Sequence, residues 1–437
     1  MNADLIGDMF RTLALPGLKR AAGLATRLAP IPQPTLLVGP GSSLRLAHAA
    51  CHGGHAKLLV VTDADISRLG LMQPLLDAFD ARGMRYVVFD QVSADAPMPQ
   101  IDAGAQRFRE QGCDAVVAFG GGSVIDAAKA IALAAANRKP VARLVGYFQS
   151  LHAAAPIYAV PTTAGTGSEV SVAALVSDPQ TQRKRLIVDT RIVPRIAALD
   201  PNLMTGLPPE ITAATGMDAL THAIEAYLGQ WSTGFSNRMA LAAVAMIYEN
   251  LGVAYRDGKN LAAREAMALA SSYAGLAFTR AGVGNVHAIA HQLGGRYHTP
   301  HGLANAIMLP HVLRFERPAV IDRLAALALS ARLGEPAEPQ DVLARKFIDS
   351  IVALNAALGI PAHLDALRES DIPALAEAAC HEADFNYPVP RVMSRRDCEQ
   401  VLREVLVLVP QPDSARRPAR AARPTGPARR RPGAPRP

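Results

Sequence analysis

The feature that most constrains the fold is a change of hydrophobic pattern near residue 205. Before it, short apolar runs alternate with helical patterns such as 101–112 and 123–137. The apolar runs predict six strands, at 35–39, 57–63, 85–90, 114–119, 156–160 and 196–200. Continuous runs of valine, leucine and isoleucine are typical of strands buried on both faces of a parallel sheet. We therefore expect residues 1–206 to form a doubly wound, mostly parallel α/β domain.

The second half of the chain has a different pattern. After "TGLPPEITAATG" (205–216), alanine- and leucine-rich segments with helical periodicity replace the strands. They predict helices at 210–227, 236–252, 260–278, 284–294, 317–333, 340–357 and 395–407. Helix-forming residues dominate these segments, and Gly or Pro marks most of the breaks between them. We expect residues 207–410 to form an all-helical domain.

The net charge of +7 belongs to the end of the chain. Of 45 basic and 38 acidic residues, eight arginines and one aspartate lie from Gln411 onward, which leaves 37 of each in the rest. A neutral body argues against specific nucleic-acid binding. The tail, 411–437, has no large apolar residues to bury, so we expect it to be disordered. A polyanion-binding arm is the alternative for this tail.

The sequence argues against a membrane protein, an exported protein and a small domain held by disulfides or a zinc ribbon. No apolar run approaches the roughly 20 residues that span a bilayer. Acidic residues stand in the first ten positions, where a signal peptide would be basic. The four cysteines form no CxxC pair, so neither a disulfide framework nor a zinc ribbon is indicated. We expect a cytoplasmic enzyme with no membrane association.

Two polar turns follow predicted strands of the sheet. In "GGGS" (120–123), glycines would let the backbone approach a phosphate, whose charge is favoured at the start of the next helix. A plain strand-to-helix turn is the alternative. In the second turn, "PTTAGTGSEVS" (161–171), the side chains of Thr162, Thr163, Thr166 and Ser168 give four hydroxyls at the carboxyl end of a strand, where open α/β sheets bind ligands. Together the two turns favour a dinucleotide.

A carboxylate bears on the choice between NAD and NADP. Asp63 ends the second predicted strand. There it could accept a hydrogen bond from a ribose hydroxyl, whereas it would repel a 2′-phosphate. NAD is therefore favoured, with NADP as the alternative.

Five side chains of the helical half are candidate metal ligands. Asp218 and His222 are four residues apart, and so are His287 and His291, so each pair shares one face of a helix. His301 follows in "HTPHG", at a turn or helix start. Carboxylate and imidazole ligands suit divalent Fe, Zn, Mn, Co or Ni. Spacing leaves open which four of the five bind, and surface histidines without a ligand role are the alternative.

Taken together, these motifs resemble one family. "GGGSVIDAAKA", "PTTAGTGSEVS", "GMDALTHAIEAY" and "GVGNVHAIAHQLGGRYHTPHGLANAIMLPHV" (282–312) are similar to the iron-containing, group III alcohol dehydrogenases, which include propanediol oxidoreductases and 1,3-propanediol dehydrogenases. The resemblance runs in order from about residue 30 to about residue 405 and leaves out the tail. It implies a dinucleotide-binding domain, a helical metal-binding domain and an active site in the cleft between them.

The resemblance also implies individual roles. The metal ligands fall on Asp218, His222, His287 and His301, and His291 then lies near the metal and the nicotinamide. The cofactor positions are Asp63, Gly121, Gly122, Ser123, Asp126, Thr162, Thr163, Thr166 and Lys184.

Two further positions concern the substrate. Phe278 matches a residue that lines the substrate pocket in the propanediol branch. Ala173 stands where that branch has asparagine. The smaller, apolar residue indicates room for a longer or less polar substrate than a short diol.

The implied activity is the interconversion of a primary alcohol and its aldehyde. Hydride passes between the substrate carbon and the nicotinamide, while a divalent metal polarises the substrate oxygen. Fe(II) is the metal that the resemblance favours, with Zn, Mn, Co or Ni as alternatives. His291 is our candidate for relaying the proton, and a role in shaping the pocket is the alternative. We expect a homo-oligomer that acts on small alcohols and aldehydes.

Two rival functions use the same features differently. A metal-dependent hydrolase would use the Asp and His residues to activate water, but it leaves the two polar turns unexplained. A non-catalytic binding protein would act through the basic tail, and deletion of 411–437 would then abolish function, whereas a dehydrogenase would keep near-normal turnover. We expect His298 to be a surface histidine or to lie just outside the ligand set, and we assign His311 no role.

Overall fold

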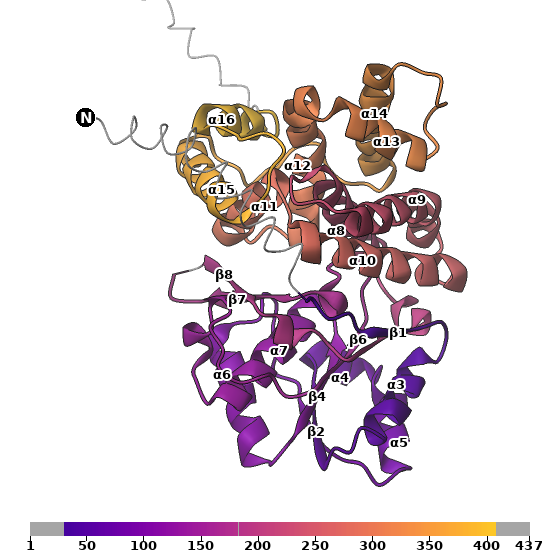
Figure 1. Cartoon of the computed structure of the whole chain (residues 1–437), viewed down its shortest axis with the longest axis vertical. Helices are drawn as coiled ribbons and strands as arrows, with labels where there is room; N and C mark the ends of the chain where they lie inside the picture. Colours follow the sequence, from indigo (N-terminus) through magenta and orange to yellow (C-terminus); the bar gives the residue numbers. More distant parts are fainter. Residues whose placement is uncertain (1–29, 182, 408–437) are drawn as a thin grey trace, which may run out of the picture. The chain divides into compact units, whose positions relative to one another are not determined.

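The computed structural model describes residues 30–181 and 183–407, with the side chain of Arg183 left out. The tail that we expect to be disordered, 411–437, lies outside the described residues. The described residues up to Leu406 belong to one compact unit, whose elements are labelled in Figure 1.

A six-stranded parallel sheet forms the core of the first half. Its strand order is β1-β9-β6-β4-β2-β3, and every neighbouring pair runs parallel. The strands are β1 (Thr35–Val38), β2 (Lys57–Val61), β3 (Arg85–Phe89), β4 (Ala115–Gly120), β6 (Ile157–Pro161) and β9 (Ile196–Leu199). All six strands predicted from the apolar runs are therefore confirmed.

Helices cover both faces of this sheet. They are α3 (Ser42–Cys51), α4 (Ala64–Leu69), α5 (Gln73–Asp80), α6 (Met98–Glu110) and α7 (Gly122–Asn137). In β2, Leu58 and Val60 join a core cluster with side chains of α3 and α5, whereas Leu59 and Val61 join a cluster with α6 and α7. Successive residues of a strand point to opposite faces, so this division explains why the strand is apolar throughout.

A second, three-stranded sheet is absent from the sequence prediction. It consists of β5 (Gly146–Tyr147), β7 (Ala173–Asp178) and β8 (Arg183–Val188), in the order β5-β8-β7. The β7 and β8 strands form an antiparallel hairpin in which Ala173 pairs with Val188. In β7, fully buried residues alternate with partly exposed ones, and β8 begins with charged residues. The β8 strand has only three consecutive apolar residues, and the short apolar run of β7, VAALV (172–176), was not recognised as a strand.

The second half is helical throughout its described residues, apart from an isolated bridge between Leu364 and Leu406. Its helices are α8 (Pro209–Leu228), α9 (Gly234–Arg256), α10 (Leu261–Ala281), α11 (Asn285–Tyr297), α12 (His301–Glu316), α13 (Ile321–Ser330), α14 (Gln340–Ala357), α15 (Ile372–Asn386) and α16 (Arg395–Arg403). None of the described helices is long and apolar enough to cross a membrane.

The sequence prediction missed two of these helices, α12 and α15. Pro310 lies inside α12, where a proline normally ends a helix. The residues before it, Ala304–Leu309, are all buried, so α12 lacks the polar face that marks an amphipathic helix. The predicted helix 317–333 was also too long, because α13 occupies only Ile321–Ser330.

The threonine-rich turn after β6 packs directly on α10. A Cβ on Gly275 of α10 would lie 2.8 Å from the carbonyl oxygen of Gly167 in that turn, so the two backbones touch. Beside this contact, the hydroxyl of Ser272 donates to the buried carboxylate of Glu169 at 2.6 Å. These contacts fix the polar turn of the sheet against α10 of the helical half.

Candidate active site

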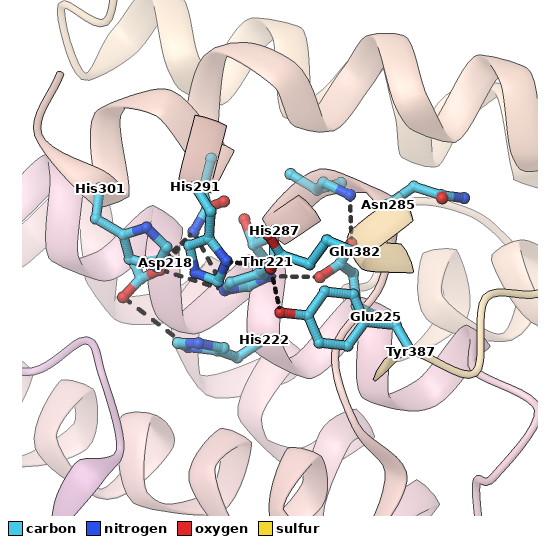
Figure 2. Close-up of polar contacts among 12 residues, drawn as sticks. Asp218, Thr221, His222, Glu225, Asn285, His287, His291, His301, Glu382 and Tyr387 are labelled. Carbon is cyan, nitrogen blue, oxygen red and sulfur yellow. Dashed lines mark hydrogen bonds and ion pairs between the residues drawn. The ribbon is translucent and has the colours of Figure 1, made fainter. Parts of the chain in front are cut away.

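Three helices bring together the four residues that the family resemblance singled out. Asp218 and His222 lie one turn apart on α8, His287 lies on α11, and His301 begins α12. One potential ligand atom from each lies within 4.8 Å of the others. The Oδ1 atom of Asp218 is 3.5 Å from Nε2 of His301 and 3.8 Å from Nε2 of His287. Figure 2 shows these side chains pointing toward one another.

A glycine allows α12 to approach α8 this closely. A Cβ on Gly302 would lie 2.2 Å from the carbonyl oxygen of Ala214 and 3.3 Å from the Cβ of Asp218. Backbone atoms cannot give way as a flexible side chain can. The "HTPHG" sequence can place His301 beside Asp218 because the next residue, Gly302, has no side-chain carbon.

The three imidazoles of this cluster are neutral. Burial lowers the pKa of His222 to about 4 and that of His287 to about 3. Burial, followed by the charges of neighbouring groups that include Lys184, also holds the pKa of His301 well below its ordinary value. A neutral imidazole keeps the lone pair that a metal ion requires.

The cluster has the chemistry of a divalent metal site. The Nδ1 atoms of His222 and His301 are buried and have no hydrogen-bond partner in the protein. One carboxylate and three neutral imidazoles are a donor set that divalent Fe, Zn, Mn, Co or Ni accepts. The residues present therefore fit a divalent cation.

Two residues that we did not predict hold the cluster in place. Glu225, whose pKa burial raises to about 7, bonds Nδ1 of His287 at 2.5 Å, which turns Nε2 toward the cluster. Asn305 is fully buried, and its amide nitrogen donates to Oδ1 of Asp218 at 2.7 Å. Such outer partners orient metal ligands in many proteins. Helical spacing held a signal for both, since Glu225 follows His222 by three residues and Asn305 follows His301 by four.

His291 lies beside the cluster and does not form part of it. Its ring stacks on that of His301, with centroids 5.2 Å apart and planes 17° apart. Its Nδ1 atom bonds Oε1 of Glu382 on α15 at 2.6 Å. The structure thus separates the two histidines of "HAIAH", which spacing alone treats as equivalent.

The two polar turns predicted to bind a dinucleotide meet each other. A Cβ on Gly122 would lie 2.4 Å from Cγ2 of Thr166, and one on Gly121 would lie 3.5 Å from the hydroxyl of Thr163. Gly121 is the N-cap of α7, so no side chain of the N-cap residue bonds the first backbone N–H groups of the helix. Thr162, mostly buried, continues β6 into the threonine turn. The turns therefore form one surface at the start of α7.

Three other predicted cofactor residues, Asp63, Ser123 and Lys184, have polar partners within the protein. Asp63 caps α4 by accepting from the backbone of Ile66 at 2.8 Å. Ser123 and Lys184 converge on Asp95, which we did not predict: the Ser123 hydroxyl accepts from the Asp95 backbone at 3.1 Å, and Nζ of Lys184 lies 2.7 Å from Oδ1 of Asp95.

Asp126 is partly buried, and each of its carboxylate oxygens accepts a hydrogen bond within the protein. One accepts from the hydroxyl of Ser168, and the other accepts from the backbone of Leu175 at 2.9 Å. In this arrangement Asp126 braces the threonine turn and β7. Each oxygen can accept a second hydrogen bond, so the role of Asp126 in cofactor binding stays a prediction.

Comparison with known proteins bears directly on the identity of this site. Residues 33–201 match the family described as iron-containing alcohol dehydrogenase, and residues 212–406 match the Fe-containing alcohol dehydrogenase family, C-terminal. Alcohol dehydrogenase 4 of Saccharomyces cerevisiae is 38% identical over 354 residues, which cover 80% of this chain and 91% of the yeast protein. The chain belongs to the iron-containing alcohol dehydrogenase family. It is an oxidoreductase that interconverts alcohols and aldehydes.

Two further relatives of this dehydrogenase are similar along nearly their whole length. The NAD-dependent methanol dehydrogenase of Bacillus methanolicus is 35% identical over 377 residues, which cover 85% of this chain and 98% of the relative. The crystal structure of a 1,3-propanediol oxidoreductase superposes with a TM-score of 0.83 at 36% identity and covers 86% of this chain and 98% of that one. The sheet domain and helical domain that we expected are therefore those of this family.

The predicted substrate positions of the dehydrogenase can now be placed. The ring of Phe278 on α10 lies against the candidate metal cluster, and its centroid is 4.6 Å from that of the His222 ring. Ala173 begins β7, and its carbonyl oxygen accepts from the buried Nζ of Lys129 at 2.8 Å.

His298 is exposed at the end of α11. His311 pairs with Glu404 at 2.6 Å.

Proposed function

We propose that this protein oxidises a primary alcohol, and reduces its aldehyde, with NAD and a divalent metal held by Asp218, His222, His287 and His301. The observation that carries the proposal is the convergence of one carboxylate and three neutral imidazoles from α8, α11 and α12. Gly165 in the threonine turn packs on α8, the helix of Asp218 and His222, since a Cβ on Gly165 would lie 2.8 Å from the carbonyl oxygen of Thr215. That contact links the metal cluster to the turns that we propose bind the dinucleotide.

The cofactor assignments are part of the same proposal. Gly121, Gly122, Ser123 and the threonines of the turn would hold the pyrophosphate at the start of α7, where the backbone N–H groups and the helix dipole favour negative charge. Asp63 would accept from a ribose hydroxyl, which favours NAD over NADP. A relative named as NAD-dependent supports this choice. We propose Fe(II) as the metal, because the family is named for iron.

The residues of the site divide the chemical work. When bound, the metal would polarise the substrate oxygen and NAD would accept the hydride. Glu225 holds the ring of His287, and Asn305 holds the carboxylate of Asp218. His291, beside the cluster, would accept the proton of the substrate hydroxyl and release it to water. Phe278 would form one wall of the pocket, and Ala173 would leave space for a longer or less polar substrate.

A substrate panel tests this proposal. The full chain is purified without oxygen, and short primary alcohols, their aldehydes and 1,2-propanediol are assayed by NADH or NADPH absorbance. We expect turnover with NAD, and higher kcat/KM for unbranched alcohols than for the diol. In Ala173→Asn, preference for the diol should rise about fivefold, the effect of one hydrogen bond worth about 1 kcal/mol. Absence of nucleotide-dependent turnover with every substrate would refute the proposal.

A further inference from the structure

Glu382 on α15 accepts three hydrogen bonds at the edge of the site. Its Oε1 bonds Nδ1 of His291 and the hydroxyl of Tyr387, each at 2.6 Å. Its Oε2 accepts from the amide of Gln292 at 2.7 Å. Figure 2 shows His291, Glu382 and Tyr387 grouped beside the candidate metal cluster. None of these three donors belongs to the candidate metal cluster.

The hydrogen bonds determine which atom of His291 carries a proton. Burial acts to raise the pKa of Glu382, but its electrostatic interaction with His291 and the hydrogen bonds from His291, Tyr387 and Gln292 hold that pKa below the ordinary value. Burial raises the pKa of Tyr387, so its hydroxyl remains a donor. An ionised carboxylate has no proton to give, so Nδ1 of His291 must donate. In the neutral ring, Nε2 then carries the lone pair.

The position of the ring suits a transfer between the cluster and the protein surface. His291 stacks on His301 and stands edge-on to His287, whose ring centroid is 6.0 Å away. The side chain of His291 is 9% exposed, and that of Glu382 is 23% exposed. Through Glu382 the pair therefore reaches the protein surface.

We propose that Glu382 is a positioning residue for proton transfer, an inference that rests on the proposed function. It holds His291 in the tautomer whose Nε2 accepts the proton of the substrate hydroxyl, and its charge stabilises the imidazolium that results. In this step the substrate O–H bond breaks and an Nε2–H bond forms, without any change in oxidation state. The imidazolium then returns its proton to water. Aldehyde reduction uses the same step in reverse.

The tautomer can be measured without turnover. The full chain is labelled with 15N-histidine and loaded with Zn²⁺, and long-range 15N–1H spectra identify which ring nitrogen carries hydrogen. The signals of His291 are assigned by their loss in His291→Gln. We expect a protonated Nδ1 and an unprotonated Nε2, and loss of this preference in Glu382→Leu. A proton on Nε2 in the unaltered protein would overturn the proposal, whether or not the enzyme oxidises alcohols.

Kinetics test the charge of Glu382 separately. Glu382→Gln keeps an oxygen acceptor of the same size but removes the charge. We expect kcat to fall by about 10- to 100-fold, as for other outer residues of metal sites, with an unchanged alcohol KM and metal content. Tyr387→Phe, which removes only one donor to the carboxylate, should give a smaller fall in kcat.

A second histidine–glutamate pair provides the matched control. His311 and Glu404 have the same 2.6 Å bond. His311 lies ten residues beyond His301 on α12, about 15 Å along the helix axis. Glu404→Gln should leave kcat within about twofold of the starting value. If Glu382→Gln does the same, or loses metal in proportion to its activity, Glu382 does not position a proton acceptor.

Discussion

The two histidines of "HAIAH" differ because their partners differ. His287 has Glu225 on Nδ1 and presents Nε2 to Asp218, whereas His291 has Glu382 on Nδ1 and lies outside the cluster. Spacing could predict that both share one face of α11, but it could not distinguish them. Glu225 is near His222 in the chain and could have been recognised, whereas Glu382 is separated from His291 by 91 residues. A contact at that separation leaves no periodic signal in one sequence.

Substitution of each histidine should therefore have a different effect. His287→Ala removes a ligand, so we expect it to lose both metal and activity. His291→Ala leaves the cluster intact, so it should retain metal while kcat falls by about 100-fold or more, the usual contribution of a positioned proton acceptor. Metal analysis and kcat measured on the same samples check both expectations. Two variants that are both fully loaded with metal would contradict the ligand assignment.

At the scale of elements, apolar runs decided which strands could be predicted. All six strands of the large sheet were recognised from such runs, although β1 and β3 are partly exposed. The β8 strand begins with three charged residues, and neither it nor β7 was recognised. The α12 helix was not predicted because it contains Pro310 and because the residues before that proline form no polar face. Its first residue is nevertheless the candidate ligand His301. The helix could be found only from its packing against α8.

That packing predicts the effect of a single methyl group. In Gly302→Ala, the added Cβ would meet the backbone of Ala214, so α12 must move away from α8 and take His301 with it. We expect the free energy of unfolding to fall by about 1–3 kcal/mol, as in other overpacked cores, and metal affinity to fall with it. Denaturant unfolding and a chelator competition measure the two quantities.

Gly206→Ala is the control for this substitution. Gly206 is exposed, and a Cβ there would meet no atom within 4 Å. We expect stability and metal affinity to stay near those of the unaltered protein. Equal behaviour of the two alanine variants would show that the α8–α12 contact does not position His301.

At the scale of the whole molecule, the site depends on contacts between the sheet and the helices. Gly167 touches Gly275, Glu169 accepts from Ser272, and the charge of Lys184 on β8 acts on His301. The order of the motifs along the chain predicted a sheet domain followed by a helical one, and the family match confirms that order. The domain limits at 206 and 410 and the expected homo-oligomer stay predictions, because one chain carries no direct signal for either.

The central claim is that the carboxylate and three imidazoles hold the metal on which turnover depends. The most direct test is a titration of metal-stripped protein with Fe(II) in the absence of oxygen, in which the initial rate of NAD-dependent alcohol oxidation is followed at each addition. We predict no rate without metal and a linear rise that ends at one equivalent per chain. A full rate in the stripped protein, or a rate that does not respond to metal, would contradict the claim.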